Sequence, residues 1–227
     1  MDLKIFPDAD AVALAAASFL ATEAKEAIAA RGRVVIAVSG GKTPWAMLRA
    51  LAEEQVPWSG LEIVQVDERV APAGDPDRNL THLQESLLGH SPLSPERIHA
   101  MPVERPDLEA AAAEYAQTVA ALAGAPPVLD VVHLGLGPDG HTASLVPSDP
   151  VLEVTDRDVA ITGVYQGRQR MTLTYPAIAR ARMILWLVTG AEKREMLKRL
   201  LAADSSIPAG RVRQDTAVAL VDRAAAT

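Results

Sequence analysis

Apolar and polar positions alternate along the chain with two periods, one typical of helices and one of strands. Apolar side chains recur on one helical face of residues 9–31, and Gly32 follows as a stop signal. These side chains are Val12, Ala16, Phe19, Leu20, Ala27 and Ile28. Residues 33–38, RVVIAV, form a β-branched run too short for a helix, which predicts a buried strand. A second amphipathic helix is expected in WAMLRALAEE.

The same alternation continues towards the C-terminus. Further strands are expected at residues 61–66, 128–134, 158–164, 183–188 and 216–221. Helices are expected at 76–89, with Asp75 as cap and Gly89 as stop, at 106–124, with Pro106 near the start, and at 191–203. This order predicts an α/β fold, a mostly parallel sheet with helices on both faces. No repeat or long linker interrupts the pattern, so we interpret residues 1–227 as a single domain.

Three polar motifs follow predicted strands directly. They are SGGKTP at 39–44, DER at 67–69 and GLGPDGH at 135–141. Ligands of open α/β sheets bind beyond the carboxyl ends of the strands. The coincidence of three such motifs at strand ends therefore predicts a pocket that all three line.

The first motif lies between a predicted strand and a predicted helix. Gly40 and Gly41 would let backbone N–H groups approach an anion, and the helix N-terminus adds a favourable dipole. Ser39 and Thr43 supply hydroxyl donors, and Lys42 supplies positive charge. The same residues also suit a tight turn in which Thr43 is the N-cap and the following proline is the first helical residue. The spacing differs from that of a Walker A loop.

The second motif puts two carboxylates and an arginine at a strand end. Asp67 could accept a hydrogen bond from a substrate hydroxyl, and Arg69 could pair with a phosphate. An internal ion pair between an acid and the arginine is the structural alternative. Asn79 follows a loop rich in Pro, Gly and Asp and is expected just inside a helix, as a site residue or an ordinary turn residue.

The third motif, GLGPDGHTASLVP, is the most specific. Gly137 belongs to the turn at the strand end, and Gly140 allows close approach before a short predicted helix. His141 is expected at the mouth of the pocket, where an imidazole with a pKa of about 6.5 suits a general base. Asp139 could orient His141 or bind a hydroxyl. His133, inside the predicted strand, is interpreted as a partly buried packing residue.

Other basic residues lie near the predicted strand ends. Arg168 and Arg170 are either solvated or directed into the pocket, and for Lys193 a surface position is the simpler interpretation. The chain has no HExxH motif, no pair of histidines on one helical face and no G-x-S-x-G motif. We therefore expect no metal, no other cofactor and no nucleophilic serine.

Composition and charge restrict the partners. With 29 acidic against 22 basic residues the net charge is −7, so nucleic acids and membrane surfaces are not expected partners. A bound anion would then require a local cluster of positive charge. The absence of cysteine fits a reducing cytoplasm, and neither a signal peptide nor a membrane-spanning run is evident. We expect a cytoplasmic monomer or weak homodimer.

Five segments, SGGKTP, DERVAPAGDPDRN, GLGPDGHTASLVP, RMTLTYPAI and TGAEKREMLKRLL, together resemble the 6-phosphogluconolactonase family. The resemblance runs from about Ser39 to near the C-terminus and implies a Rossmann-like fold, similar to glucosamine-6-phosphate deaminases and ribose-5-phosphate isomerases. The deaminases have roughly GHIAFNEP here, with a catalytic glutamate where this chain has Val146. Asn79 matches the lactonases, whereas Arg78 stands where they often have serine.

The resemblance implies a small phosphorylated sugar lactone as substrate, 6-phosphoglucono-δ-lactone, hydrolysed to 6-phosphogluconate in the oxidative pentose phosphate pathway. His141 would deprotonate the attacking water and then protonate the departing ring oxygen, and backbone N–H groups or Arg170 would hold the oxyanion. The residues that would bind sugar hydroxyls or orient His141 are Asp67, Asn79 and Asp139. The phosphate would be held by SGGKTP, Arg69, Arg170 and Lys193. A deaminase or isomerase and a non-catalytic sugar-phosphate sensor remain alternatives.

Overall fold

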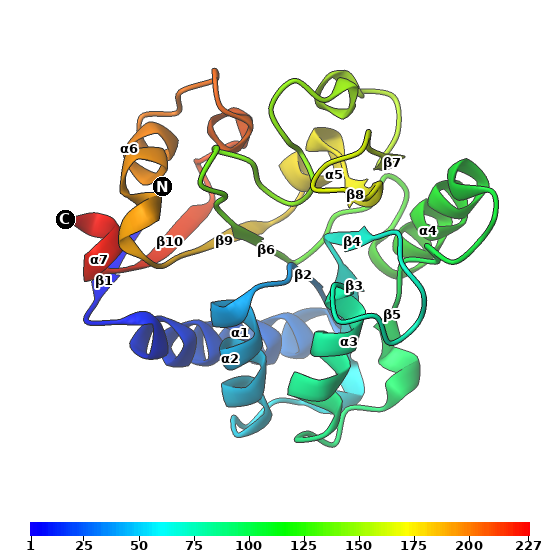
Figure 1. Ribbon diagram of the computed structural model, residues 1–227. Coiled ribbons are helices and arrows are strands. Elements are labelled where there is room, and N and C mark those ends of the chain that lie inside the picture. Colours follow the sequence, from blue (N-terminus) through cyan, green and yellow to red (C-terminus); the bar gives the residue numbers. More distant parts are fainter.

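The computed structural model describes residues 1–227, and its main sheet has seven strands (Figure 1). Across the sheet they are β1 (Asp2–Phe6), β10 (Ala217–Asp222), β9 (Met183–Val188), β6 (Val131–Gly135), β2 (Val34–Val38), β3 (Leu61–Gln65) and β5 (Ile98–His99). Every neighbouring pair is parallel, which confirms the predicted sheet. The sequence prediction missed the two edge strands, since β1 is mostly exposed and β5 has two residues.

Helices cover both faces of this sheet, as predicted (Figure 1). One face carries α1 (Ala9–Arg31), α2 (Lys42–Ala52) and α3 (Asn79–Leu83), which a π-helical turn at Gln84–Leu88 extends. The other face carries α4 (Leu108–Ala123), α5 (Tyr175–Ala179), α6 (Arg194–Leu201) and α7 (Arg223–Ala226). Short 3₁₀ turns occur at Trp58–Gly60, Pro95–Arg97, Pro150–Glu153, Ala191–Lys193 and Pro208–Arg211. No helix is both long and apolar enough to cross a membrane.

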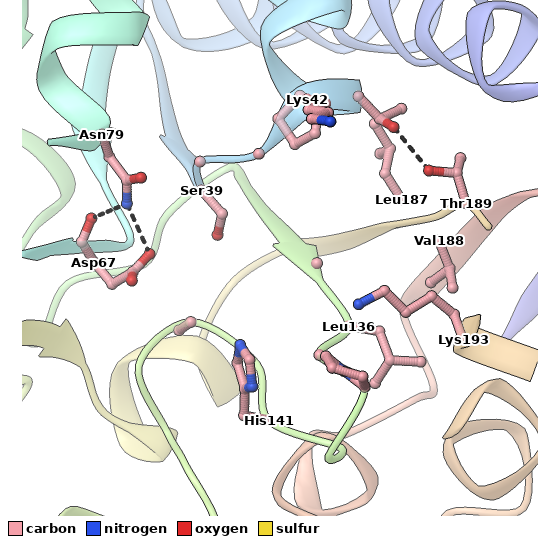
Figure 2. Close-up of a pocket in the computed structure, with 18 of the residues that line it drawn as sticks. Ser39, Lys42, Asp67, Asn79, Leu136, His141, Leu187, Val188, Thr189 and Lys193 are labelled. Atoms are coloured by element: carbon pink, nitrogen blue, oxygen red, sulfur yellow. Dashed lines mark hydrogen bonds between the residues drawn. The ribbon is translucent and has the colours of Figure 1, made fainter. Parts of the chain in front are cut away.

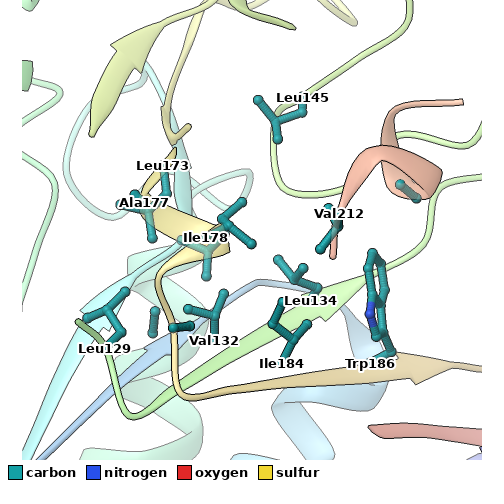
Figure 3. Close-up of a cluster of buried hydrophobic side chains, with 14 of the residues drawn as sticks. Leu129, Val132, Leu134, Leu145, Leu173, Ala177, Ile178, Ile184, Trp186 and Val212 are labelled. Carbon is teal, nitrogen blue, oxygen red and sulfur yellow. The ribbon is translucent and has the colours of Figure 1, made fainter. Parts of the chain in front are cut away.

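The strand β2 shows why the central strands are continuous apolar runs. Val35 and Ala37 join the core on the α4 side, whereas Val34, Ile36 and Val38 join the core on the α1 side. Successive side chains of a strand point to opposite faces, so a strand covered on both faces is apolar throughout. Figure 3 shows part of the core on the α4 side, where side chains of β6 and β9 meet those of α5.

A second, smaller sheet was not predicted. It is antiparallel and consists of β4 (Asp67–Arg69), β8 (Arg170–Leu173) and β7 (Val159–Ile161). The strand predicted at 158–164 is therefore shorter than expected and belongs to this sheet rather than to the main one. The pairing places Arg69 directly opposite Arg170.

One predicted helix start needs correction. The helix expected at 76–89 begins only at Asn79, because residues 72–78 form turns that Asp75 N–H and Arg78 N–H close. Asp75 accepts a hydrogen bond from Asp77 N–H and does not cap the helix. In contrast, the helix at 9–31 is confirmed, and Gly32 ends it in the left-handed region with φ +74°.

Candidate active site

The strand order reverses between β2 and β6, the place where open α/β sheets bind ligands. A cavity of about 340 Å³ lies there, bounded by loops that follow β2, β3, β6 and β9 (Figure 2). Twelve of the fourteen residues predicted for the site line it: Ser39, Gly40, Gly41, Lys42, Thr43, Asp67, Arg69, Asn79, Gly137, His141, Arg170 and Lys193. Asp139 and Gly140 lie outside the wall.

The loop after β2 is fastened to β6 by His133. Ser39 N–H donates to His133 Nδ1 at 3.2 Å, and Ser39 Oγ donates to the His133 carbonyl oxygen at 3.0 Å. His133 is fully buried, and burial lowers its pKa to about 3, so the ring is neutral. The interpretation of His133 as a partly buried packing residue was thus wrong. It joins two central strands at the point where their order reverses.

The helix α2 presents its N-terminus to the cavity. Gly41, with φ +132°, is the N-cap, so the alternative in which Thr43 caps this helix is wrong. The side chain of Thr43 instead shares a hydrogen bond of 2.8 Å with Thr189, after β9. Backbone N–H groups of the first helical turn have no partner within the helix and suit an anion. A Cβ on Gly40 would overlap the amide of Asn79, so only glycine allows this close approach.

Asp67 and Asn79 form a rigid part of the wall (Figure 2). Asn79 Nδ2 donates to the Asp67 carbonyl oxygen at 2.9 Å and to Asp67 Oδ1 at 3.4 Å. Ser144 Oγ donates to Asp67 Oδ2 at 2.7 Å. Because both carboxylate oxygens already accept protein donors, Asp67 suits the orientation of a hydroxyl better than proton transfer.

Glu68 is the buried centre of this part of the site. It accepts hydrogen bonds of 2.8 to 2.9 Å from the backbone N–H groups of Arg69, Asn79 and Leu80 and from Gln65 Nε2. Glu68 thereby caps α3 from a distant strand and orients two residues of the cavity.

The ion pair of the DER motif is made with Arg78, not with Arg69. Arg78 Nε lies 3.1 Å from Glu68 Oε2, and both side chains are almost fully buried. Arg78, which stands where the resembling family often has serine, is therefore the counter-ion of Glu68. Arg69 remains free to face the cavity.

Four cations line the cavity without forming an ion pair: Lys42, Arg69, Arg170 and Lys193. Arg69 and Arg170 are cross-strand neighbours, and the Nε atom of each is buried without a hydrogen-bond partner. Burial, and then the charge of Arg69, lower the pKa of Arg170. Burial likewise lowers the pKa of Lys193, which projects into the cavity rather than over the surface (Figure 2). Arg168, in contrast, pairs with two aspartates of the loop before α3.

His141 and Asp139 form a hydrogen-bonded pair. Asp139 Oδ1 lies 2.5 Å from His141 Nδ1, which leaves Nε2 as the ring nitrogen without a protein partner. Burial opposes the ionisation of Asp139, but the charge and hydrogen bonds of His141 outweigh it and, with a hydrogen bond from Tyr165, lower the pKa of Asp139. Asp139 is therefore ionised, and its carboxylate is the hydrogen-bond partner of the His141 ring.

A closed turn, not the expected helix, presents His141. Gly137 N–H donates to the His141 carbonyl oxygen at 2.8 Å, and Gly140 N–H donates to that of Gly137 at 3.1 Å. Gly140, with φ +83°, packs against Ile207 and shapes the turn without lining the cavity.

Sequence reasoning also missed parts of the site. Thr189 and Glu192 line the cavity, and Tyr165 donates a hydrogen bond to Asp139. Thr189 and Glu192 lie in the TGAEKREMLKRLL segment, which could have indicated them, whereas the spacing of Tyr165 gives no sign of its location. No group of three or more side chains able to ligate a metal converges in the structure.

Comparison with known proteins identifies the family. The model of the family described as glucosamine-6-phosphate isomerases/6-phosphogluconolactonase matches residues 7–221. The chain belongs to this family. The 6-phosphogluconolactonase of Streptomyces coelicolor is 38% identical over 224 residues, 91% of this chain and 85% of that protein. That of Mycobacterium tuberculosis is 38% identical over 238 residues, 99% and 96%. The crystal structure of 6-phosphogluconolactonase from Thermotoga maritima has a TM-score of 0.86 at 25% identity and covers 97% of this chain and 98% of its own.

Proposed function

We propose that this protein hydrolyses 6-phospho-D-glucono-1,5-lactone to 6-phospho-D-gluconate in the oxidative pentose phosphate pathway. The observation that carries the proposal is the His141–Asp139 pair beside a cavity with four cations outside ion pairs. The names of the family relatives support the same activity. A phosphorylated lactone needs these two features together, a base for water and positive charge for the phosphate.

The phosphate would bind between the N-terminus of α2 and the two lysines. Lys42 and Lys193 both line the cavity, Lys42 from the start of α2 and Lys193 from the turn after β9 (Figure 2). Backbone N–H groups at the start of α2 and the hydroxyl of Thr43 would add donors. This anchor is remote from the reacting carbonyl and would fix the lactone ring beside His141.

Hydrolysis would proceed through a water that His141 activates. Nε2 takes a proton from the water as its oxygen bonds to the lactone carbonyl carbon, and the carbonyl oxygen becomes an oxyanion. Arg170 would stabilise that oxyanion. When the intermediate collapses, the bond from this carbon to the ring oxygen breaks and Nε2 returns the proton to that oxygen. The product acid then releases a proton to solvent.

The residue at position 146 favours a lactonase over a deaminase, because the deaminases carry a catalytic glutamate there and this chain has valine. Val146 is buried, with 4% of its surface exposed, and it does not line the cavity. Its side chain can neither donate nor accept a proton.

The test is lactone hydrolysis by wild type and His141→Ala, with the spontaneous rate subtracted. Loss of a general base lowers kcat/KM by about 10²- to 10⁴-fold, while binding of 6-phosphogluconate, measured by calorimetry, persists. The matched control is His90→Ala, because His90 is exposed and remote from the cavity. Full activity of His141→Ala would show that His141 is not the general base. An inactive wild type would overturn the lactonase proposal, and glucosamine-6-phosphate would be the next substrate.

The single domain spanning residues 1–227, the cytoplasmic location and the monomer or weak homodimer remain predictions from the sequence.

A further inference from the structure

A tight hairpin between β7 and β8 brings Tyr165 to the active site. Tyr165 N–H donates to the Arg168 carbonyl oxygen at 2.9 Å, and the return bond measures 3.3 Å. The two residues at the turn, Gln166 and Gly167, both have positive φ, +53° and +80°, as two-residue hairpins of type I′ require. The turn therefore fixes the direction of the side chain that precedes it.

The turn end of this hairpin is held next to the site by ion pairs. Arg168 Nη2 lies 3.1 Å from Asp75 Oδ2 and 3.0 Å from Asp77 Oδ2. Asp77 in turn accepts a hydrogen bond from Arg69 at its carbonyl oxygen. The hairpin and the loop before α3 are thus joined through charged contacts.

Tyr165 contacts three residues of the proposed mechanism. Its hydroxyl donates to Asp139 Oδ2 at 2.9 Å. Its ring meets the ring of His141 edge-on, with centroids 5.5 Å apart, and the guanidinium carbon of Arg170 lies 5.0 Å from its centroid. Tyr165 does not line the cavity, so any effect it has on catalysis acts through these three neighbours.

We propose that Tyr165 is a positioning residue for the lactone hydrolysis, because it holds Asp139 in the orientation that His141 requires. The hydroxyl holds Oδ2, so Oδ1 stays directed at His141 Nδ1. This role rests on the proposed function, since it presumes that His141 activates water.

The location of Asp139 explains why a second anchor is needed. Asp139 lies in a turn, and its side chain is 35% exposed. A carboxylate held only by its contacts with His141 could rotate towards solvent, and His141 would lose the partner that fixes its tautomer. The hydrogen bond from Tyr165 to the other carboxylate oxygen prevents that rotation.

The protonation state of Tyr165 suits this role. Burial, the hydrogen bond to Asp139 and the charge of Asp139 raise the pKa of Tyr165, against the opposing charge of Arg170. The hydroxyl therefore remains a donor at neutral pH and above. The ionisable groups around it are Asp139, His141 and Arg170.

Two substitutions separate the hydroxyl from the ring. Tyr165→Phe keeps the ring beside Arg170 and removes only the donor to Asp139, which lowers kcat by about tenfold and leaves KM within about twofold. The acid limb of the pH–rate profile moves to lower pH, because a carboxylate that rotates away stabilises the protonated imidazole less. Tyr165→Leu also removes the ring and adds a rise in KM. The control is Val164→Ala in the same hairpin, where a side chain 73% exposed is shortened without loss of a site contact.

A second measurement does not depend on activity. The His141 Nδ1 proton, followed by NMR, exchanges faster with solvent in Tyr165→Phe than in wild type. A Tyr165→Phe enzyme with wild-type kcat, pH profile and proton exchange overturns the inference, as does one that loses only affinity for the lactone. If the wild type does not hydrolyse the lactone but the exchange still accelerates in Tyr165→Phe, the proposed function fails and Tyr165 still holds Asp139.

Discussion

Gly137 permits the catalytic pair to form, and its replacement by alanine tests the geometry of the site most directly. A Cβ at this position would overlap the His141 ring at Nδ1 and Cε1 and would lie 2.7 Å from Asp139 Oδ1. Real Cβ atoms essentially never approach another heavy atom within 3.0 Å. The methyl group therefore occupies the space in which His141 and Asp139 meet.

The magnitude follows from the displacement required. To restore an ordinary contact the imidazole has to move by about 1 Å, and a misplacement of that size costs about 10²-fold in rate. The backbone of Gly137 does not have positive φ, so alanine adds no backbone strain, and movement of the His141 side chain can relieve the overlap. We expect kcat/KM for the phosphorylated lactone to fall by about 10²-fold at nearly unchanged thermal stability.

The assay is lactone hydrolysis corrected for the spontaneous rate, with calorimetric binding of 6-phosphogluconate alongside. The matched control is Gly89→Ala, because a Cβ there would lie 3.5 Å from the Glu85 carbonyl oxygen, an ordinary contact far from the cavity. A Gly137→Ala enzyme within threefold of wild type, where threefold is roughly the scatter of such comparisons, would refute the role assigned to this pair. Loss of 6-phosphogluconate binding would show instead that the methyl group blocks the cavity.

Two further predictions concern stability. Arg78→Met leaves the buried charge of Glu68 without its counter-ion and lowers the free energy of unfolding, measured in urea, by about 3 kcal/mol. The control Arg105→Met removes the exposed pair with Glu114 and costs less than about 1 kcal/mol. Equal costs for the two variants would contradict the assignment of Arg78 as the counter-ion of Glu68. For His133, the pKa of about 3 lies below the ordinary 6.5, so its contribution to stability is complete above pH 6.5 and is lost as pH falls towards 3. The loss approaches 1.4 kcal/mol per pH unit at most, about the value of one pKa unit, and denaturant titrations should find a shallower pH dependence in His133→Gln.

The central strands and the location of the site were predictable because their determinants are local. Strands covered on both faces are continuous apolar runs, and the glycines of SGGKTP and GLGPDGH mark the points where two of them end. Parallel strands gather their carboxyl ends at one edge, so the motifs that followed them had to meet. Twelve of the predicted residues accordingly line one cavity.

The remaining features depend on pairings between distant segments. The small sheet consists of β4, β7 and β8, each only three or four residues long. No short window of sequence specifies a pairing between strands so far apart in the chain. The start of α3 is set by Glu68, eleven residues before Asn79, whereas a local rule selects Asp75. Tyr165 likewise reaches Asp139 from 26 residues away. The sequence therefore predicts which residues line the cavity better than it predicts the contacts that hold those residues in place.

The arginines that line the cavity lack the carboxylate partners that most other arginines have. Most arginines outside the cavity have a carboxylate partner, among them Arg78, Arg168 and Arg180. Inside it, Arg69 and Arg170 face each other across β4 and β8 with none, an arrangement that is unfavourable in the empty protein. The oxyanion proposed beside Arg170 would relieve that repulsion as it forms. A chain of net charge −7 can thus present positive charge to an anion locally, because four cations without ion pairs line the cavity.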